Sequence, residues 1–269
     1  MNNFVKRTLS GILFVALIIG SILLSQFAFA AVFALISGLA VLEFHKLTNS
    51  ASVNVNSVVG LTGALLLFVS SFLHASGIFP SIGYTIYGLY VVIILITELY
   101  RRKINPINNW AYFIMGQIFV ALPFSLLPFI AYISNYQPLV LLAVFVTIWV
   151  NDTGAYLVGV TLGKHRLFKR ISPKKSWEGF FGGALVSLLS GYLFSVLIPE
   201  ISLLQWFIFS EIIVVFGTYG DLLESLLKRT VNIKDSGTII PGHGGVLDRF
   251  DSMLLAAPVI FIYLNFLFR

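Results

Sequence analysis

The chain contains no cysteine and very little charge. None of its 269 residues is Cys, and only 10% are Asp, Glu, Lys or Arg, whereas 58% are hydrophobic. The absence of Cys excludes disulfides, zinc–thiolate centres and cysteine nucleophiles. A soluble domain usually carries about 25% charged residues, so this chain must present most of its surface to lipid. We therefore expect an integral membrane protein.

Long apolar runs fill most of the chain. Because a helix needs roughly 20 residues to cross the hydrocarbon core, the runs predict an all-α, polytopic membrane fold with about nine transmembrane helices. Residues 1–135 would hold about five spans, and residues 136–269 a C-terminal catalytic region. A removed signal peptide is the alternative for the first run. The predicted spans are 8–25, 27–45, 56–74, 82–100, 110–133, 138–161, 177–198, 203–227 and 252–268.

The basic residues lie almost entirely on one side of this topology. When the spans alternate, 16 of the 17 Lys and Arg residues fall on the side of the N-terminus, and Arg269 is the exception. The positive-inside rule places that side in the cytoplasm and the C-terminus opposite. The polar loops 163–176 and 228–251 then face the cytoplasm from a cell inner (plasma) membrane. The net charge of +6 follows from topology, so we expect no nucleic-acid partner.

Acidic residues recur near the cytoplasmic ends of the spans. Asp221 and Glu224 are three residues apart, and Asp248 and Asp251 repeat this spacing. Residues three apart share one face of a helix, and ionisable groups at membrane depth usually face a polar cavity and a partner. Four carboxylates suit a hard cation such as Mg²⁺, and Asp152 could join them. Alternatively, these acids form buried ion pairs with the basic residues Lys228, Arg229 and Arg249.

The segment 234–245 has the composition of a phosphate-binding loop. Its glycines, including Gly244 and Gly245, would let backbone N–H groups approach a phosphate closely. Lys234 and His243 could add positive charge. An ordinary flexible loop is the alternative, although the position between two pairs of carboxylates favours function.

The loop 163–176 carries a second group of basic residues. Lys174 and Lys175 could bind phosphates or anionic lipid headgroups, and Ser172 or Ser176 could begin the next helix. The remaining basic residues are interpreted as topogenic charge beside the membrane: Lys164, Arg166, Lys169 and Arg170. Two acids that end spans, Glu43 and Glu98, could complete the site, although an interfacial role is favoured for both.

Two blocks of this sequence resemble the phosphatidate cytidylyltransferases, also called CDP-diacylglycerol synthases. The 27 positions from Ser225 to Asp251 match the signature of that family, including the run from Pro241 to Asp251. The block from Asp152 to Gly179, with its run from Ser172 to Gly179, resembles the other region that the family shares. The first five spans are similar only in hydropathy and length.

The resemblance implies that CTP and phosphatidate give CDP-diacylglycerol and pyrophosphate, with Mg²⁺, a possible second cation and a homodimeric assembly. Expected metal ligands are Asp221, Asp248, Asp251 and Glu224. Expected catalytic residues are Asp221, Asp248, Asp251, Lys228, Arg229, Lys234 and His243. Expected substrate-binding residues are Lys174, Lys175, Ser172, Gly244, Gly245, Arg249 and Asp152.

Two other functions stay open at this point. A CTP-dependent polyprenol kinase would use similar groups but would need a base to activate an alcohol. A transporter or channel would line an ion path with the carboxylates. The acids, however, gather on one side of the membrane, whereas a path should place polar groups across it.

Overall fold

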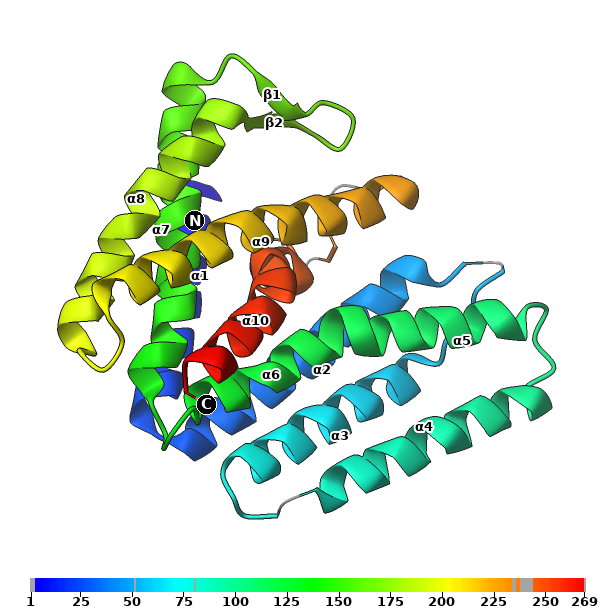
Figure 1. Ribbon diagram of the computed structural model, residues 1–269. Helices are drawn as coiled ribbons and strands as arrows, with labels where there is room; N and C mark the ends of the chain where they lie inside the picture. Colours follow the sequence, from blue (N-terminus) through cyan, green and yellow to red (C-terminus); the bar gives the residue numbers. More distant parts are fainter. Residues whose placement is uncertain (1–2, 51, 80, 234–235, 238–243, 269) are drawn as a thin grey trace. The chain divides into compact units, whose positions relative to one another are not determined.

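The computed structural model describes residues 3–50, 52–79, 81–233, 236–237 and 244–268, with side chains from residue 8 onward. Helices and two short strands follow one another along this part of the chain (Figure 1). The first elements are α1 (Asn3–Leu24), α2 (Gln26–Thr48), α3 (Ser57–Ala75), α4 (Ile82–Tyr100), α5 (Pro106–Met115), the π-helix η1 (Gly116–Ala121) and α6 (Leu122–Ala131). The others are α7 (Pro138–Leu162), β1 (Arg166–Phe168), β2 (Ser172–Ser176), α8 (Trp177–Leu197), α9 (Leu203–Thr230) and α10 (Leu247–Leu267).

The predicted all-α polytopic membrane fold is confirmed. Within the described residues, eight helical segments are long and apolar enough to cross a membrane, and α5, η1 and α6 together make one of them. The apolar part of α1 is shorter, Thr8–Leu24. These nine segments follow the order of the nine predicted spans.

Several helices begin where a polar side chain or a proline defines the first turn. Ser25 caps α2 by accepting a hydrogen bond from the N–H of Ala28 at 3.1 Å. Ser202 and Gln205 form a capping box at the start of α9. Such side chains satisfy backbone donors that have no partner within the helix. Pro138 begins α7, at a position where its missing N–H costs nothing.

The chain forms two compact units. Unit 1 comprises Met1–Tyr136 and Asp235–Phe250. Within it, α3 packs against α2, α4 and α6. Aromatic side chains fill its core, where the rings of Phe124 and Phe250 lie 5.2 Å apart.

Unit 2 comprises Gln137–Lys234 and Asp251–Arg269. Its helices α7 and α8 run side by side, and α9 packs against both (Figure 1). Small residues allow the first two helices to approach closely. A Cβ added at Gly182 would lie 2.5 Å from Cβ of Val158. The hydroxyls of Thr147 and Ser190 are hydrogen-bonded between α7 and α8 at 2.9 Å.

The sequence did not predict the β-hairpin between α7 and α8. Strands β1 and β2 are antiparallel, and Phe168 pairs with Ser172. The possibility that Ser172 begins a helix was therefore wrong, since this residue begins β2. The second possibility was right: Ser176 caps α8 and accepts a hydrogen bond from the N–H of Gly179 at 3.1 Å.

The last helix also begins earlier than expected. The predicted span starts at residue 252, but α10 starts at Leu247. Asp248 therefore belongs to the first turn of the helix, where a carboxylate interacts favourably with the exposed N–H groups and the helix dipole. Asp248 and Asp251 are three residues apart in this helix and share a face.

Candidate active site

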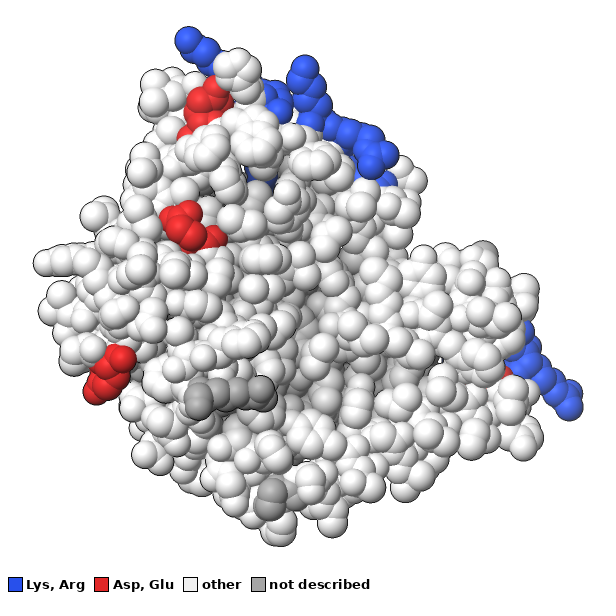
Figure 2. Space-filling model, in the orientation of Figure 1, with Lys and Arg blue, Asp and Glu red and all other residues white. Residues whose placement is uncertain are grey.

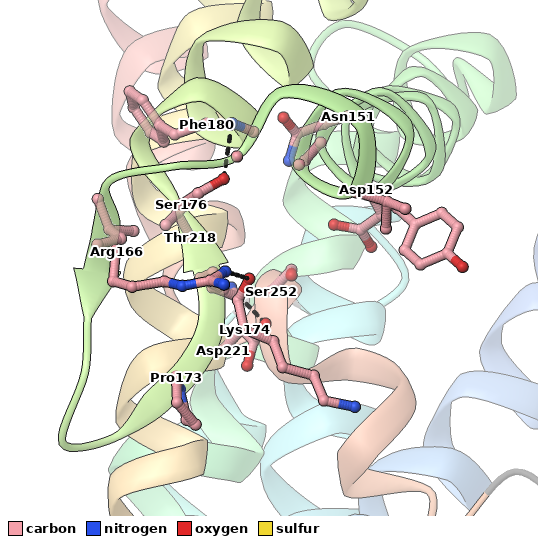
Figure 3. Close-up of a pocket in the computed structure, with 18 residues that line it drawn as sticks. Asn151, Asp152, Arg166, Pro173, Lys174, Ser176, Phe180, Thr218, Asp221 and Ser252 are labelled. Carbon is pink, nitrogen blue, oxygen red and sulfur yellow. Dashed lines mark hydrogen bonds and ion pairs between the residues drawn. The ribbon is translucent and has the colours of Figure 1, made fainter.

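A cavity of about 580 Å³ opens in unit 2 beside the hairpin. Polar side chains from several elements line its wall, and Figure 3 shows four of them around the same hollow. They are Asp152 from α7, Lys174 from β2, Asp221 from α9 and Ser252 from α10. Apolar side chains such as Val160, Leu167 and Phe180 also line it. The cavity thus combines charge with an apolar wall, as an amphiphilic ligand requires.

Asp221 is held from two sides. The ammonium of Lys175, on β2, forms an ion pair with Oδ2 of Asp221. The hydroxyl of Ser225, one turn further along α9, donates to Oδ1 at 3.1 Å. Because both charged side chains are only partly exposed, their attraction is less screened than at an open surface. The hairpin and α9 thereby meet at this pair.

Asp251 lies among other acids of unit 2. Asp221, Glu224 and Asp152 are all close enough to repel its carboxylate. Glycine allows α9 to approach α10 closely here, since a Cβ added at Gly220 would clash with the backbone oxygen of Asp251. The predicted clustering of acidic residues is thus present in this unit.

The buried acid Glu224 has a basic partner one turn along α9. Its Oε2 lies 2.5 Å from Nζ of Lys228, and its side chain is fully buried. A buried carboxylate is costly unless it is paired. Glu224 and Lys228 therefore form the buried ion pair that the sequence offered as the alternative to a metal site.

The donor chemistry of this acidic cluster fits a divalent cation. Carboxylate oxygens are the ligands that Mg²⁺ prefers, and a cation would relieve the repulsion around Asp251. Among the described residues, no group of three or more His, Asp or Glu side chains is already arranged to hold a metal ion. Lys175 and Lys228 now neutralise Asp221 and Glu224, so metal binding requires these acids to change partners.

In unit 1, Asp248 organises the start of α10. Its Oδ2 accepts hydrogen bonds from the backbone N–H of Ser236 at 2.9 Å and of Gly245 at 2.8 Å. Gly244 has a φ of +85°, which favours glycine. The glycines were expected to let the backbone approach a phosphate, which stays a prediction; here the N–H of Gly245 donates to the chain's own Asp248. The role of Asp248 as a metal ligand stays a prediction.

Glu43, for which an interfacial role was favoured over a place in the site, is buried, with 3% of its surface exposed. Its Oε2 accepts from the N–H of Leu247 at 2.8 Å and from the hydroxyl of Ser236 at 3.3 Å. The sequence did contain a signal, because Glu43 is an acidic residue inside an apolar run. An ionisable residue is costly at membrane depth and is therefore a candidate functional residue.

Glu98 is also buried, with 5% of its surface exposed. It accepts a hydrogen bond of 2.5 Å from Nδ2 of Asn109 and one of 2.7 Å from Nη1 of Arg101. Arg101 also donates to the backbone and side-chain oxygens of Asn54, each at 2.9 Å. This network ties the end of α4 to α5 and to the segment before α3.

The other predicted residues divide into three groups. Lys174 and Lys175 line the cavity, whereas Ser172 begins β2 and is not among the cavity's lining residues. Arg229 is exposed and donates to the carbonyl of Ile233 at 3.2 Å. Arg249 is exposed in unit 1. Lys234 and His243 lie outside the described residues.

Arg166 is a further residue of the cavity wall that the sequence assigned to topogenic charge. Its Nη1 donates to the carbonyl of Lys174 at 3.4 Å, across the hairpin. Asn151 and Thr218 also line the cavity. These residues carry no distinctive spacing, and only the fold of the hairpin and helices reveals their position.

Comparison with known proteins identifies relatives over nearly the whole chain. A model of the cytidylyltransferase family matches residues 5–267. The chain belongs to the cytidylyltransferase family. The phosphatidate cytidylyltransferase of Bacillus subtilis (strain 168) is 32% identical over 275 residues, covering 98% of each chain. Proteins with the same name are 34% identical in Staphylococcus epidermidis, over 91% of each chain, and in Staphylococcus haemolyticus, over 84% of this chain and 86% of the relative.

Membership of the cytidylyltransferase family agrees with the two sequence blocks. The resemblance to phosphatidate cytidylyltransferases extends to the first five spans, which the blocks did not cover. The first block contributes Asp152, Lys174 and Lys175 to the wall of the cavity in unit 2, whereas the second block ends at Asp251, directly before the lining residue Ser252.

Proposed function

We propose that the protein is a phosphatidate cytidylyltransferase, which converts CTP and phosphatidate into CDP-diacylglycerol and pyrophosphate. The observation that carries the proposal is full-length similarity to proteins of that name. The cavity supports it, since basic and acidic side chains meet an apolar wall among helices that can cross a membrane. Phosphatidate needs both environments.

The reaction joins two anions. An oxygen of the lipid phosphate attacks the α-phosphorus of CTP, a new P–O bond forms, and the bond from the α-phosphorus to the bridging oxygen breaks. The electron pair leaves with pyrophosphate. The second pKa of a phosphate monoester is about 6, so the nucleophile is already largely ionised at neutral pH and requires no strong base. Catalysis then depends on positioning and on charge neutralisation.

The basic residues of the hairpin are placed to neutralise this charge. Lys174, Lys175 and Arg166 line the cavity, and we assign them to the phosphate groups of the two substrates. Lys175 would leave Asp221 when a phosphate binds. Lys228, Arg229, Lys234, His243 and Arg249 are proposed as further phosphate contacts, with the backbone of Gly244 and Gly245 approaching the nucleotide.

The carboxylates are proposed to hold Mg²⁺. Asp221, Asp251 and Glu224 would be ligands, with Asp152 close enough to Asp251 to assist, and the metal-ligand role of Asp248 stays a prediction from the sequence. When bound, the ion neutralises phosphate charge and orients the phosphates. A second cation could share so acidic a site.

Location and assembly complete the proposal. We propose that the site faces the cytoplasm from the cell inner (plasma) membrane, where CTP is available, and the distribution of basic residues supports this orientation. Phosphatidate would enter from the bilayer. We propose a homodimer, to be tested by the mass of the purified protein after subtraction of bound detergent.

Labelled CTP tests the reaction. Purified protein in detergent is incubated with phosphatidate, Mg²⁺ and CTP labelled at either the α- or the γ-phosphate. The proposal predicts that α-label enters the lipid and that γ-label appears in pyrophosphate. Transfer of γ-label to a polyprenol would indicate a kinase instead. Activity in detergent would also separate an enzyme from a transporter, because transport needs a sealed vesicle.

A further inference from the structure

A second hollow lies on the hairpin of unit 2. Its volume is about 500 Å³, and it is lined by Lys164, His165, Arg166, Lys169 and Trp177. Only Arg166 also lines the larger cavity of the candidate active site. The acids Asp152 and Asp221 are absent from its wall, so the hollow presents basic and aromatic groups.

Glu178 fixes the frame of this hollow. Its carboxylate accepts hydrogen bonds from the backbone N–H groups of Lys164 and His165 at 3.1 Å, and it lies 2.6 Å from Nδ1 of His165. The N–H of Trp177 donates to the carbonyl of His165 at 2.9 Å. The start of the hairpin is therefore attached to the start of α8, and the carboxylate of Glu178 is engaged by the backbone of Lys164 and by His165.

The basic side chains of the hollow are available to a ligand. Lys164 and Lys169 are exposed, and neither forms an ion pair with a carboxylate in the described part of the chain. Figure 2 shows Lys and Arg side chains gathered at the end of this unit that carries β1 and β2. A group with several acceptor oxygens, such as a phosphate, matches this arrangement.

The position of the hollow selects a phosphate that is attached to lipid. The hairpin joins α7 at Leu162 to α8 at Trp177, and both helices are long and apolar enough to cross a membrane. It must therefore lie close to the headgroups. Two aromatic side chains are exposed there, Phe168 at 45% and Trp177 at 47%. The amphipathic indole of Trp177 is favoured at the boundary between water and hydrocarbon.

We propose that the hollow lined by Lys164, Lys169 and Trp177 binds the phosphate headgroup of an anionic phospholipid. The lipid bound there would be separate from the substrate in the larger cavity. Lys164 and Lys169 would neutralise the phosphate, while the indole of Trp177 contacts the glycerol and the first part of the acyl chains. This inference concerns binding, so it holds or fails independently of the proposed reaction.

Quenching of tryptophan fluorescence measures this binding directly. The full-length protein in neutral detergent micelles is titrated with brominated phosphatidylglycerol or brominated phosphatidylcholine. The signal that belongs to the hollow is the part of the quenching that Trp177→Phe removes. We expect phosphatidylglycerol to reach half of that quenching at a mole fraction several-fold lower than phosphatidylcholine does. Of the two lipids, only phosphatidylglycerol carries a net negative charge.

Charge variants locate the site. Lys169→Gln should weaken the phosphatidylglycerol interaction by about fivefold, the contribution expected of one Lys near an anionic headgroup. Lys164→Gln should act similarly. Lys103→Gln removes the same charge from an exposed Lys in the loop between α4 and α5 and should leave the quenching unchanged. Each variant is first compared with the wild type by gel filtration and circular dichroism, which confirm the fold.

Three results would overturn the proposal. Equal quenching by both lipids would show that charge does not select the ligand. Equal effects of Lys169→Gln and Lys103→Gln would show that the net charge of the protein, not the hollow, attracts the lipid. Full competition by excess inorganic phosphate, at a constant ionic strength, would assign the hollow to a free anion instead of a lipid. Retained preference in phosphate would support the lipid headgroup.

Discussion

The carboxylate of Glu43 accepts a hydrogen bond of 2.8 Å from the backbone N–H of Leu247, a residue that follows it by 204 positions. The hydroxyl of Ser236 donates to the same oxygen. Asp248 binds the backbone of Ser236 and Gly245 from the other side. Two buried or half-buried acids therefore shape the described parts of the glycine-containing segment before α10.

Replacing Glu43 by Ala should destabilise this segment. The substitution leaves the N–H of Leu247 buried without its acceptor, which costs about 1–3 kcal/mol. Glu43→Gln retains an acceptor oxygen and should lose less stability. We expect the melting temperature in detergent to fall clearly for Glu43→Ala and only slightly for Glu43→Gln, with lower cytidylyltransferase activity in the same order.

The matched control for Glu43 is Glu200→Gln, because Glu200 is exposed between α8 and α9. It should melt at the wild-type temperature. If Glu43→Ala also did so and retained full activity, the hydrogen bonds from Leu247 and Ser236 would have no role in holding the segment.

Gly245 should not tolerate a side chain. A Cβ at this position would collide with the carboxylate of Glu43 and with the hydroxyl of Ser236. We expect Gly245→Ala to lower activity at least tenfold, since the carboxylate would have to leave Leu247, a loss of about 1.4 kcal/mol or more. Gly88→Ala is the control, because nothing lies within 4 Å of its added Cβ. Initial rates at saturating CTP compare the two, and equal rates would contradict the expected clash.

Hydropathy and charge predicted the helices because lipid exposure imposes long apolar segments. The same features could not predict the hairpin, since Lys174, Pro173 and Ser172 are poor strand formers. Pairing with β1 and attachment to α8 override that local preference. The contacts of Glu43 could not be predicted for a related reason. Its partners Leu247 and Ser236 are about 200 positions away, and local sequence carries no information about such contacts.

Lys175 and Asp221 should be energetically coupled. Their side chains form an ion pair across the cavity, so either substitution alone leaves a partly buried charge without its partner. We expect Lys175→Gln and Asp221→Asn each to reduce stability, and the double variant to lose less than the sum of the two. A coupling of about 0.5–3 kcal/mol is typical of residues in contact.

Chemical denaturation in mixed micelles measures the stabilities of the wild type, the two single variants and the double variant, and these four values give the coupling energy. Lys174→Gln provides the comparison, since Lys174 lines the same cavity but forms no ion pair with Asp221 among the described residues. When Lys174→Gln is combined with Asp221→Asn, the loss of stability should be nearly the sum of the two single losses. Coupling of equal size for both lysines would mean that general cavity charge, rather than the pair, links β2 to α9.

The acidic cluster around Asp251 predicts how the enzyme depends on metal. Removal of divalent ions by EDTA should abolish activity, and Mg²⁺ should restore it. Asp251→Asn removes one ligand and its charge, so the Mg²⁺ concentration for half-maximal activity should rise by about tenfold or more, the factor that corresponds to 1.4 kcal/mol of lost binding. Glu200→Gln should leave that concentration unchanged. If Asp251→Asn lowered the maximal rate without shifting the Mg²⁺ requirement, Asp251 would act on the fold or the substrate instead of the metal, and it would leave the proposed set of ligands.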